Sequence, residues 1–143
     1  RKNKYMIEQL IKGATTAYER RGLVFEQYIE IPQEYRSSYQ YLKEYFKTRR
    51  HDLVIAYRDS QALAVANAAT ENDIKVPEEL EIVCIIDSKY NSMVRPQLSS
   101  FTFPSYDLGA VSMRVMTKML KQDNFDDREI ELSYLFTPRQ TTK

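Results

Sequence analysis

Two uninterrupted apolar runs, LVIAY at residues 53–57 and IVCII at residues 82–86, are separated by a segment with helical periodicity. An apolar run without alternation is typical of a strand that is covered on both sides, as strands of parallel sheets are. Between the two runs, residues 59–74 repeat apolar side chains at helical spacing, and Asp59 can cap that helix. A strand, a helix and a second strand in this order predict a right-handed crossover between parallel neighbours.

The remaining segments extend this alternation of helices and strands. The expected elements are a helix from about Met6 that closes at Gly22, a strand over 23–31, a helix over 34–50, a polar loop over 87–98, a short strand over 99–103, a helix over 107–121 and a last strand over about 129–136. The predicted fold class is therefore α/β, a parallel sheet with helices on both faces.

Composition restricts the classes of protein to which the chain can belong. With 143 residues, of which 43% are hydrophobic, the chain can build one core, and 21 basic against 20 acidic residues give it no basic field for binding DNA by itself. Its lone cysteine excludes an internal disulfide, and no apolar run approaches the roughly 20 residues of a membrane span. These features predict a soluble cytoplasmic protein with no membrane contact. Because the chain starts without Met and already in helical rhythm, we expect it to be a piece of a longer protein.

Residue types that carry catalysis or hold metals are scarce. His51 lies between a predicted helix and a predicted strand, and Cys84 lies inside an apolar strand, where a buried, inert thiol is expected. No Cys/His spacing fits a zinc site, and the three glycines are too dispersed for a phosphate-binding loop. The sequence predicts no enzyme, no catalytic residue, no metal and no cofactor.

Three segments resemble the LacI/GalR family of transcription regulators: DLVIAYRDSQALAVANAATENDIKVPEELEIV (52–83), MVRPQLSSFTFPSYDLGAVSMRVMTKML (93–120) and FTPRQTTK (136–143). The last two are similar, more narrowly, to the members of that family that mediate catabolite repression. The resemblance implies a dimeric repressor with a two-lobed core of the periplasmic-binding-protein-like type I fold. It also implies that operator DNA is bound only through an N-terminal headpiece that this sequence lacks.

The resemblance also implies a division of the chain between the two lobes. Residues 1–102 and 134–143 would form the C-terminal lobe of the regulatory core, and residues 103–133 would be a crossover segment of the N-terminal lobe. The rest of that N-terminal lobe would be absent from the sequence. This division predicts that the helix over 107–121 has natural packing partners outside the chain.

A row of residues four apart, Tyr106, Ala110, Arg114 and Lys118, lies on one face of the helix predicted over 107–121. By itself such a row is a solvated basic face. The resemblance to the catabolite-repression members implies that Tyr106, Arg114 and Lys118 of this chain dock a serine-phosphorylated phosphocarrier protein. Arginine suits phosphate through its paired donors, and lysine adds a point charge. Departures from the family pattern at Ser105 and Val115 leave the identity of the partner open.

The effector cleft implied by the resemblance comprises Tyr57, Arg58, Asp59, Ile86 and Asp87. Sugar-responsive members of the family carry an Arg, an Asn and an Asp where this chain has Leu10, Arg58 and Ile86. A polyol needs several converging hydrogen bonds, so these replacements predict that a standard sugar is not the effector. Two alternatives stay open: a lobe of a solute-binding protein, and a regulator whose small ligand is admitted by Arg58.

Overall fold

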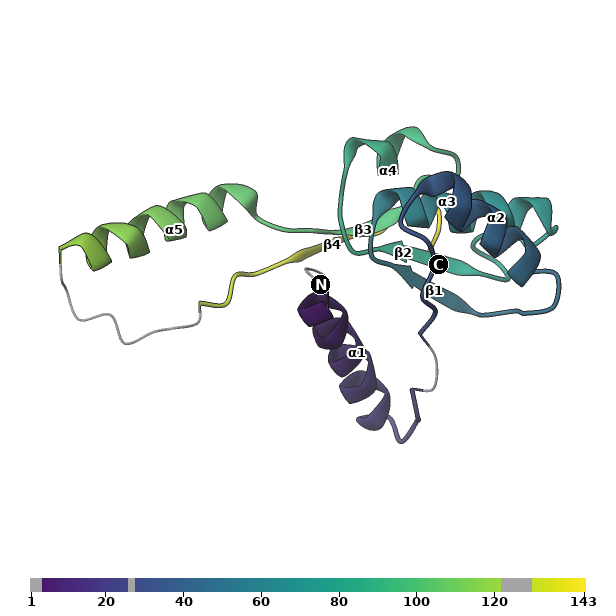
Figure 1. Cartoon of the computed structure of the whole chain (residues 1–143), viewed down its shortest axis with the longest axis horizontal. Helices are drawn as coiled ribbons and strands as arrows, with labels where there is room; N and C mark the ends of the chain where they lie inside the picture. The colour runs from purple at the N-terminus through teal and green to yellow at the C-terminus, as the bar shows by residue number, and fades with distance from the viewer. Residues whose placement is uncertain (1–3, 26–27, 122–129) are drawn as a thin grey trace. The chain divides into compact units, whose positions relative to one another are not determined.

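The computed structural model describes residues 4–25, 28–121 and 130–143 (Figure 1). The chain divides into two units, Arg1–Ile31 and Pro32–Lys143. The first unit contains α1 (Lys4–Glu19), which confirms the helix predicted at the start of the chain. Gly22 follows it with a φ of 68°, and the Leu23 amide donates to the Tyr18 carbonyl at 3.0 Å. This left-handed glycine closes the helix, because a residue with a Cβ is disfavoured there.

The strand predicted over residues 23–31 is not formed in the residues of this stretch that the structure describes. Residues 23–25 and 28–31 belong to no strand, and residues 26–27 lie outside the described part of the chain. Leu23 and Val24 are exposed. Alternating β-branched and aromatic residues produce a strand only when a neighbouring strand completes their backbone hydrogen bonds, and no described strand pairs with this stretch. The local preference is therefore not realised in these residues.

The sheet of the second unit has four strands in the order β1 (Leu53–Ala56), β2 (Glu81–Cys84), β3 (Ser99–Thr102) and β4 (Leu135–Thr137) (Figure 1). The first three strands are mutually parallel, and β4 pairs antiparallel with β3. This mostly parallel sheet confirms the predicted α/β class. β4 is shorter than expected, since residues 130–134 are not extended in the sheet and residue 129 lies outside the described residues.

The core lies where α3 (Asp59–Glu71) packs on the sheet. α3 contacts β1 and β2, and α2 (Tyr35–Tyr45) packs against α3. α2 begins at the cap Glu34, whose carboxylate accepts from the Arg36 and Ser37 amides at 2.9 Å each. The buried side chains of α3 are Ala62, Ala64, Val65, Ala66, Ala68 and Ala69. Small side chains let the helix approach the strands closely, so that Leu42 and Phe46 complete the core from the α2 side.

One face of β1 is less covered than its apolar sequence predicts. Leu53 and Ile55 are 47% and 54% exposed, whereas Ala56 is buried. Within this unit the main contacts of β1 are with β2 and α3. A helix covers only the face on which it packs, so the alternate side chains of β1 stay accessible in this unit.

The loop predicted over residues 87–98 contains a short helix, α4 (Lys89–Met93). Ser88 caps it, because its hydroxyl accepts from the Tyr90 amide at 3.2 Å. The polar composition of the segment concealed this single turn. The helix predicted over 107–121 is confirmed as α5 (Ser105–Leu120), which begins two residues earlier, directly after Pro104.

The C-terminal tail is tied into the sheet by Thr141. Its hydroxyl, which is fully buried, donates to the Ile82 carbonyl at 2.6 Å and accepts from the Ser99 amide at 2.9 Å. The Ile82 amide in turn donates to the Thr141 carbonyl at 2.8 Å. One side chain therefore connects β2, β3 and the tail.

Thr141→Val removes this hydroxyl with little change in volume. It leaves the Ser99 amide without its acceptor in a buried site, so the free energy of unfolding should fall by about 1–3 kcal/mol. Urea unfolding followed by circular dichroism measures this loss. Thr70→Val is the matched control, since the Thr70 hydroxyl bonds an α3 carbonyl at an exposed position. Equal losses in the two variants would contradict a connecting role for Thr141.

Candidate functional site

The residues predicted for the effector cleft lie at the carboxyl edge of the parallel strands. Tyr57, Arg58 and Asp59 follow β1, and Ile86 and Asp87 follow β2. In a parallel sheet these ends meet at one edge, which is where α/β proteins bind ligands. Ser88 joins the two groups, because its hydroxyl donates to Asp59 Oδ2 at 2.7 Å. Tyr57, Arg58, Asp59 and Asp87 are half-buried, and Ile86 is exposed.

Arg58, not Asp59, is the cap residue of α3. Its backbone is extended, with φ −120° and ψ 154°, and its side chain makes no capping hydrogen bond. Asp59 is the first helical residue, and its Oδ1 accepts from the Ser60 amide at 2.7 Å. The predicted capping role of Asp59 is therefore wrong by one position. Its carboxylate still sits at the positive end of the helix dipole, while its second oxygen is used by Ser88.

The Arg58 guanidinium lies over the ring of its neighbour Tyr57, with 5.9 Å between Arg58 Cζ and the ring centroid. This distance is within the range of a cation–π interaction. It places a positive charge and an aromatic face together at the end of β1.

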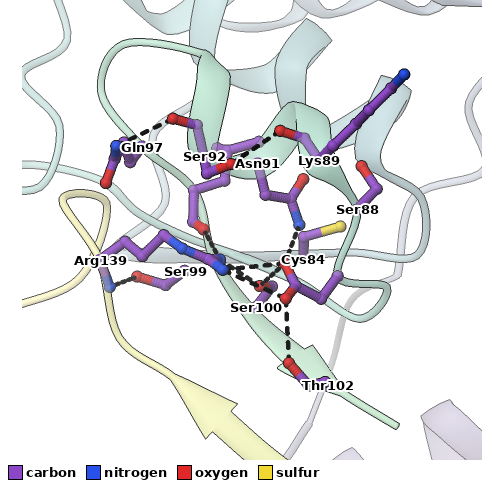
Figure 2. Close-up of polar contacts among 12 residues, drawn as sticks. Cys84, Ser88, Lys89, Asn91, Ser92, Gln97, Ser99, Ser100, Thr102 and Arg139 are labelled. Atoms are coloured by element: carbon purple, nitrogen blue, oxygen red, sulfur yellow. Dashed lines mark hydrogen bonds and ion pairs between the residues drawn. The ribbon is translucent and has the colours of Figure 1, made fainter. Parts of the chain in front are cut away.

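Asp87 is surrounded by hydrogen-bond donors from the chain itself. Its carboxylate accepts from Ser100 Oγ at 2.8 Å, Thr102 Oγ1 at 3.1 Å, and Arg139 Nη2 at 3.1 and 3.3 Å. Asn91 Nδ2 donates to it at 3.3 Å. Figure 2 shows Arg139, Ser100 and Thr102 converging from β3 and from the chain after β4. We call Asp87 and these four donors the Asp87 node.

Arg139 has further partners within the node and beside it. Its Nη1 donates to the Leu98 carbonyl at 2.7 Å and to Ser100 Oγ at 2.6 Å, and its backbone amide donates to Ser99 Oγ at 2.8 Å. The guanidinium thus binds two groups of the β3 segment and the Asp87 carboxylate at once. Only arginine has the planar fork that this arrangement requires.

The electrostatics of the node favour an ionised Asp87. Partial burial raises the pKa of the carboxyl group, but the hydrogen bonds from Ser100 and Thr102 and the charge of Arg139 lower it, and the net pKa is below the ordinary value of 3.8. The side chains of Arg139 and Asp87 are 15% and 23% exposed, so their attraction is partly shielded from solvent.

Cys84 and the Oδ1 atom of Asn91, whose Nδ2 belongs to the node, take part in no reactive arrangement among the described residues. Cys84 Sγ donates to the Ile86 carbonyl at 3.1 Å, and burial raises the pKa of the thiol to about 11. This agrees with the inert thiol predicted from the sequence. Asn91 is buried, and its Oδ1 has no hydrogen-bond partner among the residues that the structure describes.

The sequence did not predict the donors of the node. Ser100, Thr102 and Asn91 are common polar residues, and Arg139 was seen only as part of the tail FTPRQTTK. The one available signal is an arginine two residues after the end of a strand. Nothing in the local spacing indicates that it pairs with an aspartate 52 residues earlier.

The predicted docking residues lie on α5. Tyr106 is 86% exposed, and Arg114 and Lys118 are also exposed. Their four-residue spacing places them along one side of the helix. α5 has no buried residue, and its exposed apolar side chains include Leu108, Met113, Met116 and Met119. The helix therefore presents both charged and apolar groups.

Comparison with known proteins identifies the family to which this fold belongs. The family model of a periplasmic binding protein-like domain matches residues 1–142, and the chain belongs to this family. Within it, the chain is an effector-binding domain of the LacI/GalR type that resembles catabolite control protein A. The predicted resemblance is confirmed.

Three relatives document this likeness. Catabolite control protein A of Staphylococcus aureus is 31% identical over 140 residues, 95% of this chain and 42% of the relative. That of Staphylococcus xylosus is 37% identical over 100 residues, 70% of this chain and 30% of the relative. The crystal structure of transcription regulator CcpA of Lactococcus lactis aligns with a TM-score of 0.76 and 27% identity, over 92% of this chain and 49% of that one. The chain therefore spans less than half the length of these proteins.

No helix within the described residues has both the length and the apolar character required to span a bilayer.

The lowered pKa of Asp87 predicts a pH-dependent contribution to stability. Because its folded-state pKa is below the unfolded value of 3.8, the contribution is fully present well above pH 3.8 and is lost as the pH falls through the folded-state pKa. Urea unfolding of the wild type and of Asp87→Asn between pH 7 and pH 2.5 measures it. The wild type should be the more stable at pH 7, and the difference should shrink in acid. A difference independent of pH would contradict the ionised state of Asp87.

Proposed function

We propose that the chain is the regulatory core piece of a cytoplasmic transcription regulator of the LacI/GalR type. The support is the family match over residues 1–142 together with relatives named catabolite control protein A. Its balance of 21 basic and 20 acidic residues suits a domain that does not itself hold DNA. Operator DNA would be bound by a headpiece outside this chain, and the regulator would work as a homodimer.

In this proposal residues 1–102 and 134–143 belong to the C-terminal lobe and residues 103–133 to the N-terminal lobe. The absence of any buried residue in α5 supports it, because a helix with exposed Leu108, Met113 and Met119 is normally covered by a partner. The rest of the N-terminal lobe would supply that cover.

The regulator would be controlled by docking of a serine-phosphorylated phosphocarrier protein on α5. The observation that carries this proposal is the exposed row of Tyr106, Arg114 and Lys118 on one side of the helix. An arginine can bind a phosphate through two parallel N–H groups, and an exposed tyrosine offers a large contact area at low entropy cost. The proposal rests on the geometry of Arg114 and Tyr106, with Lys118 adding charge.

Arg114→Ala in the full-length regulator tests the docking surface. Loss of charge-assisted hydrogen bonds to the phosphoserine should weaken binding of the phosphorylated carrier by about 1–3 kcal/mol, measured by calorimetry. The Lys118→Ala loss should be smaller. Arg95→Ala is the matched control, because Arg95 is an exposed arginine beyond α4 that bonds only to backbone carbonyls in the structure. Equal binding of the phosphorylated and unphosphorylated carriers, or binding of neither, would refute docking at this row.

A second candidate is control by a small ligand at the carboxyl edge. Arg58 over Tyr57 favours an anionic or aromatic group rather than a neutral sugar. The Asp87 carboxylate accepts five hydrogen bonds from the chain itself, and the Ile86 side chain offers no polar atom. The same engaged or apolar side chains argue against the other alternative, a lobe of a solute-binding protein for sugars, because such a lobe needs a polar cleft.

Neutral sugars should therefore leave the full-length regulator unaffected. Glucose, galactose, ribose and maltose, each at millimolar concentration, should not raise its melting temperature, since a ligand that binds only the folded state would raise it. A saturable calorimetric signal with any of them below about 100 μM, which corresponds to roughly 5.5 kcal/mol, would overturn this reading of the edge.

A further inference from the structure

The Asp87 node joins three segments that are distant along the chain. Asp87 follows β2, Ser100 and Thr102 belong to β3, and Arg139 lies two residues beyond β4. β3 leads the chain out of the sheet into residues 103–133, and β4 brings it back. The carboxylate is therefore bonded to the outgoing strand and to the segment that follows the returning strand.

These bonds reinforce a short contact. β3 and β4 pair over three positions, from Ser100 with Thr137 to Thr102 with Leu135. Leu135 and Phe136 are exposed, and the apolar support at the outer end of this pairing comes from the Phe101 ring, whose centroid lies 5.1 Å from that of Phe136 and 5.7 Å from that of Tyr134. A two-stranded pairing of this length is marginal without further bonds. The charged bonds of Asp87 to Thr102 and Arg139 supply them at both of its ends.

Hydrogen bonds connect the loop that carries Asp87 with the start of α3 and with β3. Ser88 directly follows Asp87, and its hydroxyl bonds Asp59 at the start of α3. The Asp87 amide donates to the Phe101 carbonyl in β3 at 3.1 Å. The loop after β2 thus touches both α3 and the outgoing strand.

We propose that the Asp87 node is a conformational lock that holds the outgoing and returning strands together, and so sets the direction in which residues 103–133 leave the sheet. The proposal does not depend on the identity of the regulator's partner. It gives Asp87 a role at the place where the chain leaves and re-enters the sheet, and its oxygens are bonded internally and are not available to an effector. Release of the lock loosens β3 and β4 and leaves β1 and β2 in place.

Hydrogen exchange of the chain, followed amide by amide by NMR at pH 7, tests the lock. In Asp87→Asn the amides of residues 100–102 and 135–137 should exchange about ten-fold faster or more, because the neutral amide forfeits charge-assisted bonds. The amides of residues 53–56 and 81–84 should keep their protection. Arg139→Lys retains a positive charge without the fork, so it should give a smaller increase in the same two strands.

Glu71→Gln is the matched control. Glu71 Oε2 pairs with Lys43 Nζ at 2.6 Å and joins α3 to α2, away from β3 and β4. It should leave exchange in residues 100–102 and 135–137 unchanged. An equal acceleration in all four strands of Asp87→Asn, or no acceleration in β3 and β4, would overturn the proposal. If Asp87→Asn does not fold, Arg139→Lys decides by the same pattern, and failure of both to fold would show a general structural requirement instead of a lock.

Discussion

The close approach of α3 to the sheet is the constraint on which the rest of this structure depends. Ala62, Ala64, Ala68 and Ala69 have no exposed surface, so their Cβ atoms form the contact between the helix and its neighbours. Larger side chains would push the helix outward, since protein interiors leave little free volume. The position of α3 fixes its first turn at the ends of β1 and β2. Arg58 and Asp59 reach the candidate effector edge for this reason.

The carboxylates of that edge are hydrogen-bonded within the chain. In a ligand-binding edge, polar side chains keep free donors and acceptors for the ligand. Here the Asp87 carboxylate is occupied by Ser100, Thr102 and Arg139, and Asp59 is occupied by Ser60 and Ser88. Of the five residues predicted for this edge, Arg58 carries the remaining charge, and its guanidinium lies over the Tyr57 ring. These internal bonds support the proposal that control is exerted through a protein surface such as α5 and not through a sugar.

Local sequence patterns predicted most helices and the apolar strands, because these depend on periodicity and on residues within a few positions. α1, α3 and α5 follow from apolar spacing, and β1 and β2 from unbroken apolar runs. The described residues of the stretch 23–31 form no strand, because a strand also needs a paired neighbour. The single turn of α4 was hidden because its cap, Ser88, is a common loop residue.

The candidate site shows the same division between local and distant information. The resemblance to the LacI/GalR family placed Asp59 and Asp87 in one cleft, and the structure brings their loops together through Ser88. The partner of Asp87 could not be predicted, because Arg139 is 52 residues away and the choice among 21 basic residues depends on the antiparallel return of β4. The absence of buried residues in α5 likewise could not be predicted from the pattern within the helix, because burial depends on which distant segments pack against it.

The titration of the Asp87 side-chain carboxyl carbon, followed by ¹³C NMR with and without a neutral sugar, tests most directly whether this carboxylate is committed to the fold. A carboxylate held by Arg139, Ser100 and Thr102 should titrate with a pKa below 3.8, and the sugar should not shift its signal at any pH. A pKa at or above 3.8, or a saturable shift on addition of sugar, would show that Asp87 is free to read a ligand and would contradict the account.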